Sequence, residues 1–265
     1  TPSLLPFPQE NSYTFVGKLK DDGTIEGHCD VSMRGDGELL FRQAFRQIHQ
    51  NHWQEFLSHM ASPIGLGYEF ASIQPGNSEN TTTAFAFGWD LKRHDASDWE
   101  KKRVLVPLLP FGIENMTKLM KKPTDPIFLP SPGTNVVYKA RLEVPAGSNP
   151  TLPSTCNLSC SHAEYHARYS LENGVISVER RMTMRGGILT GQEREAFFIF
   201  CQGVMGDEDQ YISLAGAPPE IASEDPESIQ LFNQGIEAQQ RQDFITAREA
   251  FRKVLERSPR FPGAH

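Results

Sequence analysis

Apolar and polar residues alternate most regularly over residues 161–185, which predicts a long β-hairpin. Asn173-Gly174 lies at its centre and suits a two-residue type I′ turn, because both turn residues take positive φ. Pairing Glu172 with Val175 fixes the register, since a shift by one residue would exchange the two faces. The apolar face then pairs Leu171 with Ile176, Tyr169 with Val178, Ala167 with Arg180 and Tyr165 with Met182. The other face is polar and pairs Ser170 with Ser177, Arg168 with Glu179, His166 with Arg181 and Glu164 with Thr183.

The rest of the chain changes between strand-like and helix-like periods. Apolar residues at helical spacing predict a helix over 38–61, with Asp36 as its N-cap, a break near Asn51 and an end at Ser62-Pro63. A shorter helix is predicted over 114–120, and a helix that covers a sheet over 190–202. Strands are predicted at 12–20, 24–33, 68–73, 81–91, 103–109, 134–144 and 211–214. The pattern predicts an α+β protein with mainly antiparallel strands.

This order of elements predicts three parts. The first is a β-rich domain with one long helix over 11–122, and the second is a β-rich domain with hairpin 162–185 over 123–214. Each is expected to be a β-sandwich-like domain with a covering helix. A linker rich in proline and acidic residues spans 215–228, and a C-terminal helical hairpin over 227–265 follows it.

The C-terminal part has the spacing of a tetratricopeptide repeat. With Gly235 at the small position of the repeat, the other signature positions hold Leu231, Ala238, Phe244, Ala247, Phe251 and Pro259. Only Ala238 departs from the signature, which more often has an aromatic residue there. Repeats of this kind stabilise one another by stacking. We therefore expect a longer array, truncated at His265, whose helix pair docks on the second β-domain or on another chain.

Composition and charge narrow the classes of partner. The 265 residues carry a net charge of −7, and Lys and Arg are scattered along the sequence, so no nucleic-acid partner is expected. No apolar run reaches the roughly 18 residues of a spanning helix, so we expect no membrane insertion. Four cysteines are too few for a disulfide scaffold. Because the chain begins with Thr1, we expect a piece of a longer protein.

Two groups of residues have the ligand types of a metal site, and for the first the spacing along a helix is also compatible with one. The first falls within one arc of the predicted helix, beside apolar residues, and consists of His49, His52, Glu55 and His59. The second is too closely spaced to wrap an ion and consists of Cys156, Cys160, His162 and His166. Packing or hydrogen bonding explains the first group better than a metal, and surface histidines with spare thiols explain the second. We expect no cofactor, and no stoichiometric zinc in the purified protein.

The sequence has none of the motifs of a nucleophile elbow, a phosphate loop, a zinc protease or a dinucleotide site. His28 and Cys29 are the one adjacent pair of base and thiol, but neighbours along a strand point to opposite faces. No catalytic residue is therefore expected. The alternative is a hydrolase whose site combines His28 and Cys29 with the histidines of the first helix.

Two features are candidates for binding a partner. Phe85, Phe87 and Trp89 alternate along one predicted strand and form either part of the core or a stacking platform. Arg180 is the exception on the apolar face of the hairpin. Its head either meets an acidic group or anchors a ligand. Together with apolar residues of the repeat, the candidate partner-binding residues are Phe85, Phe87, Trp89, Arg180, Phe232, Ile236 and Phe261.

Several segments, in their order along residues 12–265, resemble one bacterial protein family. They are Lys121-Lys122-Pro123, Pro126-Ile127, Val178-Glu179-Arg180-Arg181, the predicted helix around Arg194 to Phe200, Tyr211-Ile212-Ser213-Leu214 and the repeat. They resemble the region that follows the transglutaminase-like core in large bacterial proteins of unknown function. The Cys, His and Asp triad of that family belongs to the core, and no stretch here resembles it. The resemblance thus carries no catalytic residue to this chain.

The resemblance implies a non-catalytic accessory or recognition module that flanks a transglutaminase-like core absent from this chain. Such a module is expected to contact a protein, a peptide or a glycan. Family membership would also imply a periplasmic or secreted location in bacteria. Two other classes stay open, namely the hydrolase with a Cys/His site and a structural spacer for a tetratricopeptide interaction array.

Overall fold

The computed structural model describes residues 9–61, 69–93, 97–98, 102–105, 111, 113, 126–129, 133–214, 227, 230–231, 234–235, 238 and 244–257. The chain divides into two compact units, residues 1–216 and 217–265. The predicted helix over 114–120 lies outside the described residues, as does most of the strand predicted over 103–109. No described helix is long and apolar enough to span a membrane.

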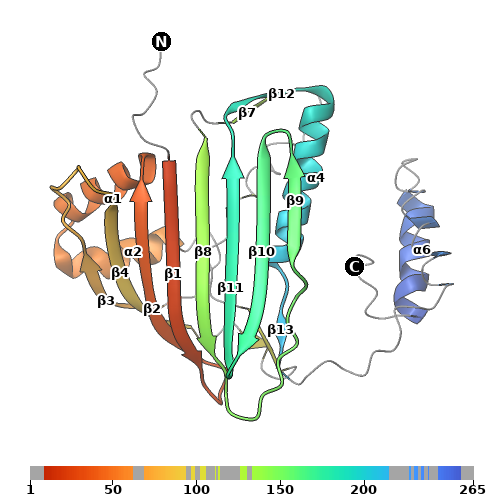
Figure 1. Cartoon of the computed structure of the whole chain (residues 1–265), viewed down its shortest axis with the longest axis horizontal. Helices are drawn as coiled ribbons and strands as arrows, with labels where there is room; N and C mark the ends of the chain where they lie inside the picture. Colours follow the sequence, from red (N-terminus) through yellow and green to blue (C-terminus); the bar gives the residue numbers. More distant parts are fainter. Residues whose placement is uncertain are drawn as a thin grey trace. The chain divides into compact units, whose positions relative to one another are not determined.

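The first unit is built on one eight-stranded sheet in the order β3-β4-β2-β1-β8-β11-β10-β9 (Figure 1). All its neighbouring strands are antiparallel except β1 and β8, which are parallel. The predicted α+β class with mainly antiparallel strands is therefore confirmed. The strands of this sheet are β1 (Gln9–Leu19), β2 (Ile25–Arg34), β3 (Glu69–Pro75), β4 (Phe85–Arg93), β8 (Thr134–Glu143), β9 (Cys156–Cys160), β10 (Ala163–Glu172) and β11 (Val175–Met184).

The two predicted β-sandwiches are instead two halves of this sheet. β1 joins the halves, since Gln9 to Lys18 pair in parallel with Thr134 to Glu143 of β8. The alternation in the sequence identified both strands but not this pairing, because a parallel partner far along the chain leaves no local turn signal. The predicted boundary after residue 122 therefore separates two parts of one sheet.

Hairpin β10–β11 has the predicted register. Glu172 pairs with Val175, Tyr169 with Val178 and Tyr165 with Met182. Asn173 and Gly174 have φ values of 51° and 76°, the positive values that a type I′ turn requires.

Two small sheets accompany the main one. β7 (Ile127–Leu129) pairs with β12 (Gly187–Leu189), and β6 (Arg103–Val104) pairs with both β5 (Ser97–Asp98) and β13 (Ile212–Ser213). Strands β7, β9 and β12 were not predicted, because runs of three to five residues show too little alternation to separate them from loops.

The helices of the first unit lie on one face of the main sheet, behind the strands in Figure 1. The helix predicted over 38–61 consists of α1 (Asp36–Gln47), the 3₁₀ turn η1 (Gln50–His52) and α2 (Trp53–Ala61). The break falls near Asn51 as predicted, but the N-cap is Gly35 instead of Asp36. Helix α4 (Gly191–Glu208) continues beyond its predicted end at residue 202.

Two apolar clusters fill the space between the sheet and these helices. One lies beneath α1 and α2 and contains Phe15, Phe87 and Trp89. The other lies beneath α4 and contains Tyr165 and Phe197. Phe111 belongs to both, because its ring centroid is 4.5 Å from that of Tyr138 in the first cluster and 5.6 Å from that of Tyr165 in the second.

The second unit contains α6 (Phe244–Arg257). Buried Gly235 packs against Phe251, since a Cβ added at Gly235 would lie 2.5 Å from Phe251 Cε1. Arg257 Nη2 lies 2.5 Å from Glu227 Oε2. These contacts join residues from both ends of the repeat, but most of the first predicted helix lies outside the described residues, so the helical hairpin stays a prediction.

Two paired glycines, one in β1 and one in β2, leave space for the ring of Phe15. Gly17 is paired with Gly27. A Cβ added at Gly27 would lie 2.4 Å from Val16 O and 2.7 Å from Phe15 Cε2. Neither contact is tolerable without movement, so the buried phenyl ring depends on the missing side chain.

We predict that Gly27→Ala lowers the free energy of unfolding by about 1–3 kcal/mol, because the new methyl group overpacks the core. Gly206→Ala is the matched control, since a Cβ at that position in α4 meets no atom within 4 Å. It should raise stability by about 0.5–1 kcal/mol through helix propensity. Urea unfolding of both variants measures the difference. Equal effects of the two substitutions would contradict the packing described here.

Candidate functional site

The face of the main sheet opposite α1, α2 and α4 is covered by no described helix of the first unit and is polar. We call it the open face. Antiparallel sheets commonly leave one face to solvent, with polar side chains alternating out of each strand. In the central strands, the side chains on the open face include Ser12, Thr14, Val16, Glu26, His28, Asp30, Asn135, Lys139, Arg141, Arg168, Ser177, Glu179 and Arg181.

Four exposed cations gather around one carboxylate on this face, and we call them the basic cluster. Glu179 on β11 is paired with Arg168 on one side and with Lys139 on the other. Arg181 lies two residues further along β11, and its Nη2 is 3.0 Å from Glu179 Oε1. Arg141 is paired with Ser177, diagonal to Glu179. Only Arg181 forms an ion pair with a described residue, so the cluster has an excess of three positive charges.

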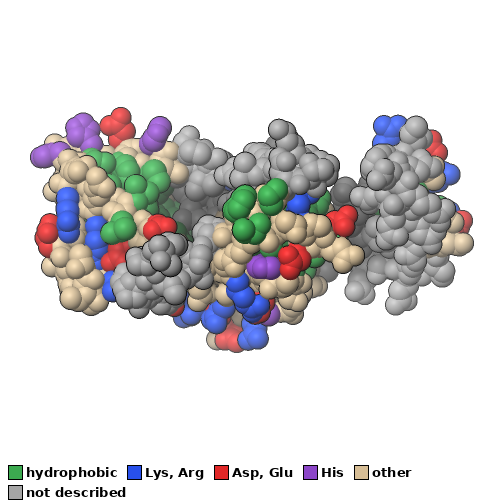
Figure 2. Space-filling view, turned by 90° about the horizontal axis from the view of Figure 1, so that it is seen from above, with side chains coloured by type: hydrophobic (Ala, Val, Ile, Leu, Met, Phe, Trp, Pro, Cys, Tyr) green, Lys and Arg blue, Asp and Glu red, His purple; other side chains and the backbone are tan. Residues whose placement is uncertain are grey.

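Figure 2 shows the molecule from above, with Lys and Arg side chains in blue. Lys and Arg side chains gather at the lower middle of the picture, on the side of the sheet that faces the reader in Figure 1. Basic residues that are scattered along the sequence thus come together on this part of the folded surface. Strand pairing brings together cations that lie far apart in the chain.

A shallow hollow of about 340 Å³ lies beside the cluster and is lined by Thr155, Asn157, His166, Arg168, Glu179 and Arg181. His166 Nδ1 is 2.8 Å from Asn157 Oδ1. Because an amide oxygen accepts only, Nδ1 is the protonated nitrogen and Nε2 is the acceptor in the neutral ring. The hollow thus offers guanidinium donors, a hydroxyl group and one imidazole acceptor.

His28, on the other half of the open face, lies between two carboxylates. Its Nδ1 is 2.7 Å from Asp90 Oδ1, and its Nε2 is 3.4 Å from Asp30 Oδ1. The hydrogen bond to Asp90, aided by the charge of Asp30, raises the pKa of His28 above its usual 6.5. Gly88 makes room for the ring, since a Cβ there would lie 2.9 Å from His28 Nε2.

We predict that His28 titrates above pH 6.5, and that Asp90→Asn lowers its pKa because the hydrogen bond to a carboxylate is lost. NMR titration of the imidazole protons measures both values. The Asp36→Asn variant on α1 removes a carboxylate elsewhere and should leave the pKa of His28 unchanged. A pKa that Asp90→Asn does not move would exclude Asp90 as the cause.

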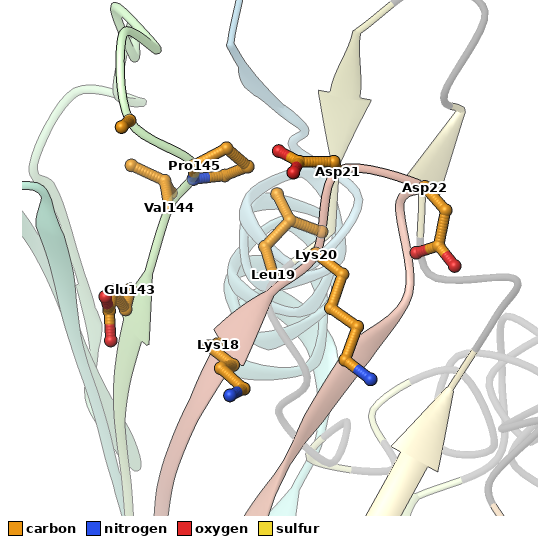
Figure 3. Close-up of a pocket in the computed structure, with 9 residues that line it drawn as sticks. Lys18, Leu19, Lys20, Asp21, Asp22, Glu143, Val144 and Pro145 are labelled. Atoms are coloured by element: carbon orange, nitrogen blue, oxygen red, sulfur yellow. The ribbon is translucent and has the colours of Figure 1, made fainter.

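A second hollow, of about 680 Å³, includes His28 and Asp90 in its lining, together with Lys18, Glu26 and Lys92. A third, of about 520 Å³, lies between the end of β1 and the end of β8. Figure 3 shows Lys18 to Asp22 on one side of this hollow and Glu143, Val144 and Pro145 on the other. Both hollows are lined by cationic and anionic side chains, so neither favours a ligand of one particular charge.

Arg180, a predicted partner-binding residue, is buried beneath α4 with an exposed fraction of 5%. Its Nε is 3.1 Å from Asp207 Oδ2, and its Nη2 donates to the Asp207 carbonyl at 2.9 Å. The hydroxyls of Tyr165 and Tyr169 also donate to the Asp207 carboxylate, at 2.5 and 2.9 Å. Arg180 is therefore an internal ion-pair partner and not an exposed ligand anchor.

Glu208, the residue after Asp207, forms a hydrogen bond with the backbone at Phe111. Its Oε1 accepts the Phe111 backbone N–H at 2.7 Å. Burial raises the pKa of Glu208 from 4.5 to about 7, against the opposing effect of this hydrogen bond. A carboxyl group that ionises near neutral pH thus lies beside the ring that belongs to both apolar clusters.

We predict that the free energy of unfolding decreases as the pH rises from 4.5 to about 7. In this range the unfolded chain has already released the Glu208 proton, whereas the folded chain still holds it. The decrease in the free energy of unfolding should be on the order of 2–3 kcal/mol. Glu208→Gln keeps an acceptor for Phe111 and should flatten this dependence, whereas Glu195→Gln, at an exposed position of α4, should not. Urea unfolding across this range tests it. An unchanged pH slope in Glu208→Gln would refute the assignment.

The aromatic stripe is core and not a platform. Phe85, Phe87 and Trp89 are 1%, 4% and 5% exposed. Phe41 and Phe45 of α1 cover them, with ring centroids 4.8 and 5.3 Å from Phe87. The other predicted partner-binding residues, Phe232, Ile236 and Phe261, lie outside the described residues or have undescribed side chains.

The predicted metal-ligand groups are not assembled. His49 lies in the break between α1 and η1, and His52 is 3.3 Å from Glu55 as an exposed pair. In the second group, Cys156 belongs to the apolar cluster beneath α4, whereas His166 lies on the open face. Within the described part of the chain, no three His, Cys, Asp or Glu side chains are placed to hold an ion.

The thiol of the alternative hydrolase site is buried. Cys29 is paired with Trp89 in the core, while His28 contacts Asp90 on the open face. Burial raises the pKa of Cys29 to about 12, so the thiolate that would act as nucleophile is not formed at neutral pH. The imidazole and the thiol therefore do not form a catalytic pair.

Comparison with models of known protein families and with curated proteins gives no match. The resemblance to the region downstream of a transglutaminase-like core therefore stays a prediction. The sequence had already placed Arg168, Glu179 and Arg181 on one face of the hairpin. It missed the contribution of Lys139 and Arg141, because the pairing of β8 with β11 has no local turn signal.

Proposed function

We propose that this chain is a non-catalytic recognition module whose binding surface is the open face of the sheet. The observation that carries the proposal is the difference between the two faces. The helices and all aromatic side chains of the eight strands lie on one face, while the other presents the basic cluster and its adjoining hollow. The family resemblance supports the same class, an accessory module beside a transglutaminase-like core.

The partner is a protein, a peptide or a glycan outside the bacterial cytoplasm, as the resemblance implies. In this proposal the C-terminal helices are the start of a tetratricopeptide array that adds a second contact surface. A hydrolase is disfavoured by the buried thiol of Cys29, and a pure spacer would bind no ligand through the sheet.

We predict that the purified chain binds members of peptide or glycan arrays through the open face. The fluorescently labelled chain is applied to both arrays, and each ligand found is titrated against the ¹⁵N-labelled chain by NMR. Amide shifts should concentrate in β8, β10 and β11, whose outward side chains form the basic cluster.

Two outcomes would contradict this function. One is the absence of any ligand on both arrays at millimolar protein concentration, which favours the spacer. The other is a set of ligands whose shifts map to α1, α2 or α4, which would place recognition on the helical face. A Cys29→Ser variant controls for the hydrolase alternative, because binding through the open face does not depend on a buried thiol.

A further inference from the structure

We infer that the basic cluster binds a short acidic segment of a protein partner, with its carboxylates paired to Lys139, Arg168 and Arg181. This inference rests on the proposed function and names its ligand class. Arg181 is already paired with Glu179, whereas Lys139, Arg141 and Arg168 form no ion pair with a described residue. Guanidinium groups suit carboxylates because their planar donors bind both oxygens.

The spacing of the cluster suits an extended peptide. Lys139 and Arg168 lie on either side of β11, so two strand spacings, about 9–10 Å, separate their backbones. Alternate side chains of an extended peptide lie on one side at about 6.8 Å intervals. Carboxylates two residues apart on such a peptide therefore lie on one side, at a distance between one and two strand spacings, and can meet cations of β8, β11 and β10.

The absence of rings argues against bases and sugars as the main contact. Within the described part of the eight strands, Phe, Tyr and Trp all belong to the covered face, where they pack into the two apolar clusters. Single-stranded nucleic acids bind stacking platforms of aromatic side chains beside cations. Recognition on the open face must therefore depend on charge and hydrogen bonds.

The charge of the whole chain limits the length of the ligand. The net charge is −7, and exposed Glu143 and Glu172 lie close to the cluster along the strands. At physiological salt, charges are screened beyond about 8 Å, so a short segment on the cluster meets mainly its local excess of positive charge. A long polyanion would extend over the acidic surroundings and be repelled there.

Fluorescence anisotropy with the full chain tests this inference. The probe is a fluorescein-labelled peptide of four Glu-Ser repeats, and its uncharged match has four Gln-Ser repeats. The cluster variant is Lys139→Gln/Arg168→Gln/Arg181→Gln. The control variant Lys18→Gln/Lys20→Gln/Lys92→Gln removes the same number of charges at another part of the sheet.

The expected result is saturable binding of the Glu-Ser peptide, weakened about tenfold or more by the cluster variant and less than about twofold by the control. Binding should also weaken as salt rises from about 50 to 200 mM, since the contacts are exposed ion pairs. Circular dichroism of both variants, unchanged from the parent chain, establishes that neither has unfolded. Equal loss in both variants, or equal binding of the Gln-Ser peptide, would overturn the inference.

Failure here is distinguishable from failure of the proposed function. If array ligands still bind the open face but the Glu-Ser peptide does not, the ligand class is wrong and the recognition module stands. A hexanucleotide or a sulfated hexasaccharide that binds more tightly than the peptide, and is lost in the cluster variant, would also overturn the acidic-peptide assignment. If neither the array ligands nor the Glu-Ser peptide bind the open face, both the inference and the proposed function are wrong.

Discussion

The parallel pairing of β1 with β8 is the interaction on which the rest of the first unit depends. Each half of the sheet is a set of four antiparallel strands, and such a set alone has two edges that can aggregate. Pairing β1 with β8 removes one edge from each half. The same pairing aligns the apolar side chains of both halves on one face, so Phe15 of β1 lies opposite Ala140 of β8 in the common core.

Because the register is continuous from β4 to β9, the polar side chains of these strands are aligned as well. Helices α1 and α2 cover one apolar cluster on the covered face, and α4 covers the other. Phe111 contacts both clusters. The open face combines charges from both halves, and no described apolar layer of the first unit lies above them. The covered face stabilises the fold by burial, and this leaves the polar side chains of the open face outside the core. The arrangement of charges on the open face is therefore a consequence of how the strands are joined.

Much of the fold could be predicted from local patterns. The Asn173-Gly174 turn fixed its hairpin register, and the break in the first helix followed from residues near Asn51. What the sequence could not show was which distant segments meet. The helical period over 38–61 turns Arg42 away from the apolar side of the helix, yet Arg42 is buried, with hydrogen bonds to Glu38 and to the carbonyl oxygens of Asn77 and Thr83. The loop that covers it is distant in sequence, as β8 is for the basic cluster.

The order of strands also has a consequence for how the chain is made. Every pairing among β1 to β4 is complete within residues 9–93, so these four strands can pair while the ribosome is still translating residues 94–133. The outer side of β1 must then remain unpaired until β8 emerges, because no earlier described strand pairs with it. A nascent chain therefore carries an exposed strand edge for the time of synthesis of some forty residues, at about 5–20 residues per second. This interval is the period in which the protein is most open to pairing with a wrong partner.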